Sequence, residues 1–387
     1  MPWEKMDESF QLLKTYCENQ QFKGWDPYDG LNSRFFQSLP FLRNNSFSRL
    51  LWIQLFKKSP VNFRRITSVK KDYNSKGIAL FLSAYCNLYK KSHDNNSFEK
   101  IRFLADTLIE LRVEGYSGNC WGYNFDWQAR AFFQPGNTPT VVATSYVSDA
   151  LFNAYESTAE KKYLTAALSA AAFVLNDLHR TYDEKGNFCF SYSPLDKTQV
   201  YNASMLGVRL LSRAYAQTGN QQLKEVSRKA VAYVCDRQMD NGAWSYGNLH
   251  FHRWIDNFHT GFNLECIHAY QEFTGDFCFV DHLHKGLDFY LNNFFTEKGE
   301  SKYYNDKLHP IDIHSPAQLV ICLEKLGLSE QHQPLIRQVI DWTITNMQDK
   351  SGYFYYQKNK IFTSKITYMR WSQAWMFYAL SFLANGK

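Results

Sequence analysis

The chain has 387 residues, 45% of them apolar, which is enough to build a large core. Its formal net charge is +6 and no run of Lys or Arg is longer than a few residues, so the sequence has no basic stripe for nucleic acid. The first residues, MPWEKMDESFQLLK, do not read as an export signal, and no stretch of about 18 apolar residues could cross a membrane. We therefore expect a cytoplasmic protein.

The N-terminal region predicts two helices, at about 4–19 and 46–58, on either side of the segment GWDPYDGLNS at 24–33. The Pro and Gly residues of this segment indicate a turn. We expect it to be either a surface loop or a lid over an active site. Its side chains that could contact a ligand are Trp25, Asp26, Tyr28 and Asp29.

Six apolar, helix-like runs recur along the rest of the chain at steps of 70, 58, 57, 55 and 57 residues. They begin at Asn74, Thr144, Asn202, His259, His314 and Trp371. The residue after each start is small, usually Ser or Thr, which is typical of a helix cap. Because these runs are apolar nearly all round, they predict an inner layer of helices.

Five further runs lie between them and carry apolar residues on one face only, as outer helices do. They begin at Phe98, Lys161, Gln221, Val280 and Gln333. Each is followed by a short aromatic segment, such as GNCWGYNFDW at 118 and NGAWSYG at 241. The repeating unit is therefore an outer helix, an aromatic loop and an inner helix, and such units must stack to bury their apolar faces.

With the helices at 4–19 and 46–58, these units predict an all-α (α/α)6 to (α/α)7 toroid of about 13 helices. We expect one domain over 1–387, with N-terminal helices and the possible lid in 1–70 and the repeated hairpins in 71–387. All inner helices then start at the same end, where their first residues and the aromatic loops should line one funnel. In this register His259 and His314 occupy the same position of two successive units.

The pattern resembles the six-hairpin glycosidase-like toroids over about residues 70–385. The segments CWGYNFDWQAR and GAWSYG and the 57-residue period carry the resemblance. It implies a sugar cleft formed by aromatic loops at one end of the barrel. The superfamily includes glycoside hydrolases, and related toroids form the helical domains of polysaccharide lyases and uronosyl epimerases. Terpene cyclases and protein prenyltransferases also use such toroids, but the chain has neither a DxDD motif nor a Cys/His/Asp zinc set.

Carboxylates and histidines near the predicted funnel are the candidate catalytic groups, because both can transfer protons near neutral pH. They are Asp126, Asp256, His259, Asp312 and His314. Structural roles are also open: Asp126 can pair with Arg130, Asp312 can cap a helix, and His259 can be a hydrogen-bonded structural residue. A metal site is suggested by the neighbouring His250, His252 and His259. Most of these histidines precede the helix, which argues against such a site.

Aromatic rings that could stack on sugar faces, together with Arg and Asn side chains for polar groups, are candidate substrate contacts. They are Trp121, Tyr123, Trp127, Arg130, Asn202, Trp244, Trp254, Tyr304, Arg370 and Trp371. The eight cysteines are scattered without a CxxC pair, so we expect reduced, mostly buried thiols and no zinc.

We expect a carbohydrate-active enzyme that needs no cofactor or metal and acts on an oligosaccharide or polysaccharide. The basic charge and the Arg-bearing loops favour an acidic, uronate-containing glycan. Glycoside hydrolysis by two carboxylates is the first hypothesis, by analogy with the resembling toroids. A uronate C5-epimerase or lyase is the alternative, in which His or Tyr takes a proton while Arg neutralises the carboxylate. A terpenoid cyclase-like toroid and a non-catalytic glycan-binding protein also stay open.

Overall fold

Six helices form a closed inner ring, in which each contacts the next and the last contacts the first. The computed structural model describes residues 3–130 and 132–384. The ring consists of α5 (Ser75–Ser92), α7 (Val141–Thr158), α9 (Tyr201–Thr218), α11 (Asn257–Thr274), α13 (His314–Lys325) and α15 (Trp375–Leu383). A π-helical stretch, η3 (Met369–Ala374), leads into α15. The predicted all-α toroid is confirmed, with six hairpins.

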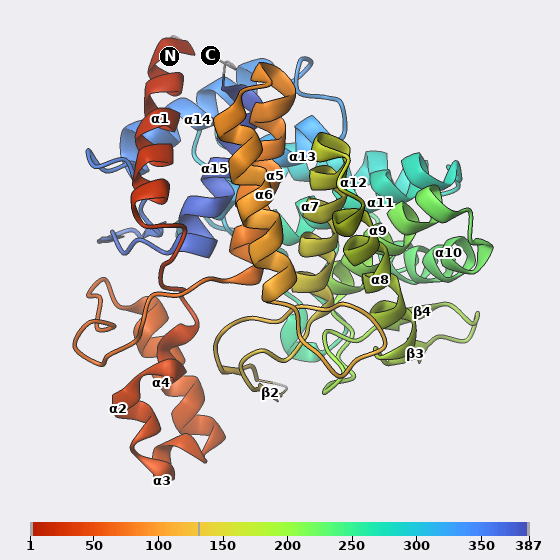
Figure 1. Ribbon diagram of the computed structural model, residues 1–387, viewed down its shortest axis with the longest axis horizontal. Helices are drawn as coiled ribbons and strands as arrows, with labels where there is room; N and C mark the ends of the chain where they lie inside the picture. The colour runs from red at the N-terminus through yellow and green to blue at the C-terminus, as the bar shows by residue number, and fades with distance from the viewer. Residues whose placement is uncertain (1–2, 131, 385–387) are drawn as a thin grey trace.

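The outer layer also has six helices, each packed on the ring. They are α1 (Trp3–Asn19), α6 (Asn95–Glu110), α8 (Lys161–Asn176), α10 (Gln221–Cys235), α12 (Val280–Phe294) and α14 (Gln333–Met347). Helix α1 contacts α14 and α15, so the first helix of the chain completes the layer next to the last one (Figure 1). The described residues contain no helix that is long and apolar enough to cross a membrane.

The inner helices are buried nearly all round, as their apolar sequences predict. The small residues near their starts have a different role from the expected one. Ser75 donates a hydrogen bond to the Gly122 carbonyl and Ser145 to the Leu206 carbonyl, both at 2.7 Å, so they tie neighbouring segments together. The side-chain N-caps of the ring are instead Asn74, Thr140 and Asp256.

Short antiparallel strands occur in the connections that lead to inner helices. They are β1 (Trp127–Gln128), β2 (Phe133–Gln134), β3 (Arg180–Tyr182), β4 (Phe188–Phe190), β5 (Ile311–Asp312), β6 (Gln357–Lys358) and β7 (Thr363–Ser364). Strand β1 pairs with β2, β3 with β4, and β6 lies between β5 and β7. In Figure 1, β2, β3 and β4 lie along the lower side of the ring of helices. The inner helices begin at this end.

Residues 29–58 form a lobe below the ring (Figure 1). It contains η1 (Asp29–Asn32), α2 (Arg34–Gln37), α3 (Pro40–Arg43) and α4 (Ser46–Lys58). A small separate cluster of Leu31, Phe36 and Ile53 forms its core. The helix expected at 46–58 is therefore present, but the expectation that it belongs to the ring is wrong. It contacts η1, α3 and β1 instead.

Charged side chains from the middle and the C-terminal half of the inner helices pair with one another. Arg213 contacts Asp149 and Glu156, and Lys325 Nζ lies 3.3 Å from Glu265. These groups neutralise one another, which is how charges are tolerated in a protein interior. Ion pairs therefore connect α7 with α9 and α11 with α13.

Candidate functional site

Asp256 and His259 form an ordered pair at the start of α11. One carboxylate oxygen of Asp256 accepts a hydrogen bond from the His259 backbone N–H at 3.0 Å and so caps the helix. The other lies 2.7 Å from His259 Nδ1 and accepts a bond from Trp254 Nε1 at 3.0 Å. Because a carboxylate only accepts, Nδ1 carries the proton, and Nε2 is left as the reactive nitrogen. The Asp256 side chain is fully buried, whereas that of His259 is 23% exposed.

His314 lies at the first position of α13 among aromatic rings. Its ring is parallel to that of Phe258, with the two ring centroids 4.2 Å apart. The centroid of the Trp375 ring lies 4.0 Å away. The side chain is 2% exposed, and neither ring nitrogen has a hydrogen-bond partner among the described residues. Burial lowers the pKa of His314 well below its ordinary value, and the nearby Lys76, His259 and Arg370 lower it further. A neutral imidazole with free nitrogens is therefore present beside His259.

The two histidines are close but do not occupy one repeat position. His259 is the third residue of α11 and His314 the first residue of α13. Both rings contact Phe258 and Phe262, which lie between them. The expected equivalence is wrong by two residues, but both side chains still lie in the first turn of their helices.

Asp312 holds the neighbouring elements together. It is fully buried and accepts hydrogen bonds from the His314 backbone at 2.9 Å, from Gln357 at 2.6 Å and from Trp371 Nε1 at 2.9 Å. Burial raises the pKa of Asp312 to about 6, although these donors act in the opposite direction. Asp312 thus fixes the backbone of His314 and the indole of Trp371.

Aromatic side chains surround these groups at the mouth of the ring. Trp254 stacks on Tyr246, with ring centroids 4.5 Å apart. The centroid of the Tyr246 ring lies 4.7 Å from that of His259. Tyr28 lies 6.2 Å from Trp127 and 5.7 Å from Trp371. Trp127, Tyr246, Trp254 and Tyr304 are partly exposed. Four aromatic rings are therefore accessible at the end of the ring where His259 lies.

Lys76, which the sequence analysis did not single out, lies against three other aromatic rings of the inner helices, two of which also contact His314. Its Nζ is 4.3 Å from the centroid of Tyr146, 5.0 Å from Trp375 and 5.2 Å from Phe262. Among the described residues Lys76 forms no hydrogen bond or ion pair, and the Tyr146 hydroxyl and Trp375 Nε1 also have no partner. Burial lowers the pKa of Lys76 well below its ordinary value, with Arg370 and Arg209 acting in the same direction.

The segment GWDPYDG is a buried strap that ties the lobe to the ring. Asp26 accepts two bonds from Arg370, at 2.5 and 2.8 Å, and Asp29 one from Arg64 at 2.6 Å. Gly24 approaches Met369 so closely that an added Cβ would lie 2.4 Å from the Met369 Cβ. The segment is therefore not a surface loop.

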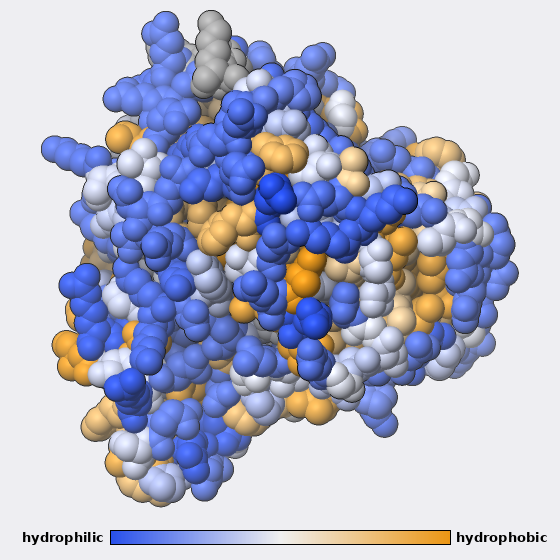
Figure 2. Space-filling view, in the orientation of Figure 1, coloured by the Kyte–Doolittle hydropathy of each residue, from blue (hydrophilic) through white to orange (hydrophobic). Residues whose placement is uncertain are grey.

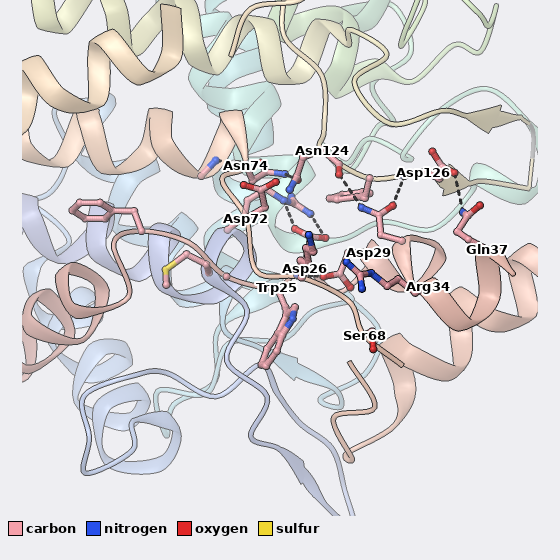
Figure 3. A pocket seen from close by; sticks show the side chains of 18 residues that line it. Trp25, Asp26, Asp29, Arg34, Gln37, Ser68, Asp72, Asn74, Asn124 and Asp126 are labelled. Atoms are coloured by element: carbon pink, nitrogen blue, oxygen red, sulfur yellow. Dashed lines mark hydrogen bonds and ion pairs between the residues drawn. The ribbon is translucent and has the colours of Figure 1, made fainter. Parts of the chain in front are cut away.

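A pocket of about 380 Å³ lies beside the strap (Figure 3). Asp26, Asp29, Asp72, Asp126, Asn74 and Asn124 line it together with Arg34, Gln37, Lys70 and Arg370. Asp126 here accepts a hydrogen bond from the Gly136 N–H at 2.8 Å. Arg370 lines the pocket and also lies 5.0 Å from the Tyr123 ring and 5.2 Å from the Trp371 ring. It thus stands between the pocket and the histidines.

The structure separates the sequence-predicted residues into groups. Asp256, His259, Asp312, His314, Trp254 and Trp371 come together, whereas Asp126 lies in the pocket with the strap. Arg130 is exposed, whereas the Tyr304 backbone forms a β-bridge with that of Asp256. Asn202 is buried, and its amide nitrogen has no partner in the described part of the chain.

Trp121 and Trp244 are not available to a substrate. Both are almost completely buried. Trp121 donates to the Leu108 carbonyl at 2.6 Å and Trp244 to the Val234 carbonyl at 3.0 Å. The same bond therefore fixes the aromatic loop to the end of its outer helix in two units. The expectation that these rings bind sugar is wrong, because repeated loop packing produces the same sequence pattern.

No protein-family model and no curated protein match the chain. Several solved structures match the chain in fold. The cellobiose 2-epimerase of Bacillus thermoamylovorans B4167 matches with a TM-score of 0.60 at 13% identity, over 80% of this chain and 87% of its own. An unsaturated glucuronyl hydrolase specific for heparin matches with a TM-score of 0.58 at 12% identity, over 80% and 84%. The Lin0763 protein of Listeria innocua matches with a TM-score of 0.63 at 11% identity, over 99% and 97%. At these identities the likeness establishes the six-hairpin (α/α) toroid fold.

Proposed function

We propose that this six-hairpin toroid converts a sugar by moving a proton at one of its carbon atoms, as an epimerase or isomerase does. The observation that carries the proposal is the Asp256–His259 pair. A buried carboxylate fixes the imidazole so that Nε2 faces outward as a base. The neutral His314 is the second proton carrier. The matching cellobiose 2-epimerase has the same fold, which is an argument from analogy.

The geometry favours proton transfer over hydrolysis by the expected carboxylates. Asp256 and Asp312 are both fully buried, and each is engaged by three donor groups of the protein. Asp126 lies on the other side of Arg370, in the pocket. A pair of acids on either side of one glycosidic bond would need free carboxyl groups facing each other.

The substrate of the proposed reaction is an acidic sugar that Lys76 binds. Arg130 and Arg370 were the expected partners of the acidic group. Arg130 is exposed, and both bonds from Arg370 go to Asp26. The Tyr146 hydroxyl and Trp375 Nε1 are instead buried donors without an acceptor among the described residues, and Lys76 Nζ lies 4.3 Å and 5.0 Å from the centroids of these two rings. A carboxylate or phosphate of the substrate supplies the missing acceptor.

Deuterium exchange tests the proposal. A panel of aldoses, reducing disaccharides and uronates is incubated with the protein in D₂O, and mass spectrometry and NMR detect deuterium on sugar carbons. We expect incorporation with the wild type and loss of about 10²–10⁴-fold in rate for His259→Asn and Asp256→Asn. His284→Asn on the outer helix α12 is the matched control and should not change the rate. Release of a monosaccharide without deuterium on carbon would overturn proton transfer.

Glycoside hydrolysis is the second candidate function, because burial raises the pKa of Asp312 to about 6. A carboxyl group with this pKa can still donate a proton near neutral pH. Hydrolysis that depends on Asp312 would slow as the pH rises through 6, since the acid is then lost. Such a reaction would cleave a disaccharide and release a new reducing sugar, which the exchange reaction would not do.

A further inference from the structure

Residues 34–71, which we call the basic lobe, contain nine Lys and Arg and not one Asp or Glu. The rest of the chain holds 34 Lys and Arg against 37 Asp and Glu, so the basic lobe supplies the whole positive net charge. Its cations are spaced along helices α2 to α4 and the following loop. They form no run longer than two residues, which is why the sequence analysis found no basic stripe.

The basic lobe also exposes an unusual density of large apolar side chains. Of the fifteen such residues in the described part of the chain, seven lie here: Phe35, Phe41, Phe47, Leu51, Leu55, Val61 and Ile66. Phe47 is 72% exposed and Ile66 81%. Single exposed apolar residues are ordinary, but a concentration in one tenth of a chain indicates an interaction surface. Figure 2 shows orange residues along the outer edge of the lower-left lobe.

Helix α4 is apolar on two faces. Ile53 is buried in the small core of the lobe, and Phe56 is buried in the main core of the protein. Phe47, Leu51 and Leu55 recur every fourth residue, so they share another face, and this face is exposed. The packing of the lobe does not use this second face.

The cations around this face are available. Arg34, Arg43, Lys58, Arg65, Lys70 and Lys71 are exposed, and within the described residues none of them forms an ion pair. Arg64 differs, because it is buried and paired with Asp29. Arg34 and Lys70 also line the pocket that contains Asp72 and Asp126, but neither forms an ion pair with them. Six exposed positive charges create an attractive field for an anionic surface.

We propose that the basic lobe docks on an anionic lipid bilayer, with the apolar face of α4 among the headgroups and the surrounding Lys and Arg on lipid phosphates. A helix with exposed Phe and Leu next to a polybasic surface is what interfacial membrane binding requires. A nucleic acid would explain the charges but not seven exposed apolar side chains. The charge excess fits an anionic partner rather than a neutral one.

Docking in this way would place the pocket at the membrane surface. Arg34, Gln37, Ser68 and Lys70 belong to the basic lobe and also line the pocket. The proposal does not depend on the proposed reaction, because its test needs no sugar.

Vesicle co-sedimentation of the full chain tests the proposal. Vesicles of phosphatidylcholine alone are compared with vesicles of two parts phosphatidylcholine to one part phosphatidylglycerol, at low and high salt. We expect binding to the anionic vesicles only, weakening with added salt. Arg43→Gln with Lys58→Gln should lower the partition coefficient about twenty-fivefold, or about fivefold for each cation removed.

The apolar contribution is tested separately by Phe47→Ser with Leu51→Ser. Both positions are exposed, so the fold should persist, which circular dichroism checks. We expect at least a tenfold loss of binding. Phe277→Ser with Ile361→Ser, exposed elsewhere, and Lys229→Gln with Lys350→Gln are the matched controls and should bind as the wild type does.

Three results would overturn the proposal. One is equal sedimentation with neutral and anionic vesicles or with none. Another is tight binding of single-stranded RNA that the charge variants abolish, together with vesicle binding that the apolar variants leave unchanged. The third is a concentration-dependent dimer that Phe47→Ser dissociates, without vesicle binding, since the apolar face would then join two copies of the chain.

Discussion

Lys76 is a cation enclosed by aromatic faces, in a place where proteins seldom leave an amine unpaired. Three rings attract its ammonium through their π-electrons, but they cannot accept the strong hydrogen bonds that water would. Burial therefore lowers the pKa of Lys76, and the cationic Arg370 and Arg209 lower it further. The charged form of Lys76 consequently reduces the stability of the folded protein.

Replacing Lys76 with Met should raise the free energy of unfolding at neutral pH by roughly 1–4 kcal/mol, the range found when buried charged groups give way to apolar ones. In the wild type the unfolded chain binds a proton at Lys76 up to its ordinary pKa of 10.5, whereas the folded chain releases it at lower pH. Wild-type stability should therefore rise relative to Lys76→Met as the pH increases toward 10.5.

Urea denaturation at several pH values measures this difference. Lys229→Met, on the exposed side of α10, is the control and should show no pH-dependent difference from the wild type. A Lys76→Met variant that is less stable than the wild type at every pH would mean that an acceptor already satisfies the amine.

Individual site residues could be predicted from the sequence only where a local pattern marks them. Asp256 and His259 are three residues apart at a helix start, so their contact follows from helix geometry. Trp121 and Trp244 were misassigned, because burial of a ring depends on packing that one chain segment does not reveal. Lys76 could have been found from the sequence, because it is the one charged residue in the apolar run NSKGIALFLSAY.

At the level of elements, the strap at 24–30 connects the lobe to the ring through buried ion pairs. Its partners, Arg64 and Arg370, are 35 and 344 residues away in the chain. Local patterns could therefore suggest a turn here but not its burial. Arg370 itself belongs to the π-helical stretch η3, a conformation that is frequent at functional sites.

Replacing Asp26 with Ala should destabilise the protein by about 3–5 kcal/mol, because Arg370 would be left as an unpaired buried charge. Adding Arg370→Met should recover part of this loss, since the unpaired charge is then gone. Chemical denaturation of the two single variants and the double variant measures the coupling. A cost below about 1 kcal/mol for Asp26→Ala would show that solvent reaches Arg370.

The helices of the ring could be predicted well from the sequence. Their starts were expected at 74, 144, 202, 259, 314 and 371, and the observed helices begin within about three residues of these positions. Apolar periodicity determines this, because an inner helix must be apolar all round. The helix at 46–58 has the expected bounds, but its place does not follow from its pattern, since a helix that is apolar on two faces fits a ring equally well.

For the whole molecule, ring closure joins the beginning and the end of the chain. Helix α15 contacts α5 and α1, and α1 contacts α14. In Figure 1 the first helix, α1, and the last, α15, lie side by side. Because the ring is closed, a chain that is opened at another loop and joined at its ends can keep every pair of neighbouring hairpins in contact.

A circular permutant tests this closure. Joining the ends with a flexible linker and opening the chain at the exposed turn between Gly219 and Asn220 should leave Tm within about 5 °C of the wild type. A permutant opened between Pro27 and Tyr28 should instead fail to fold, because it cuts the strap. Thermal denaturation compares the two. An equal loss of thermal stability in both permutants would mean that the wild-type order of hairpins along the chain is required.

The closure of the ring also determines the order in which contacts can form during translation. Asp26 is translated 344 residues before Arg370, its ion-pair partner. At 5–20 residues per second the ribosome needs roughly 20–70 s to span that distance. Throughout this interval Phe10 and Leu13 on α1 have no α14 or α15 to cover them, and Asp26 has no guanidinium. The first helix of the chain is therefore among the last to be covered by its partners.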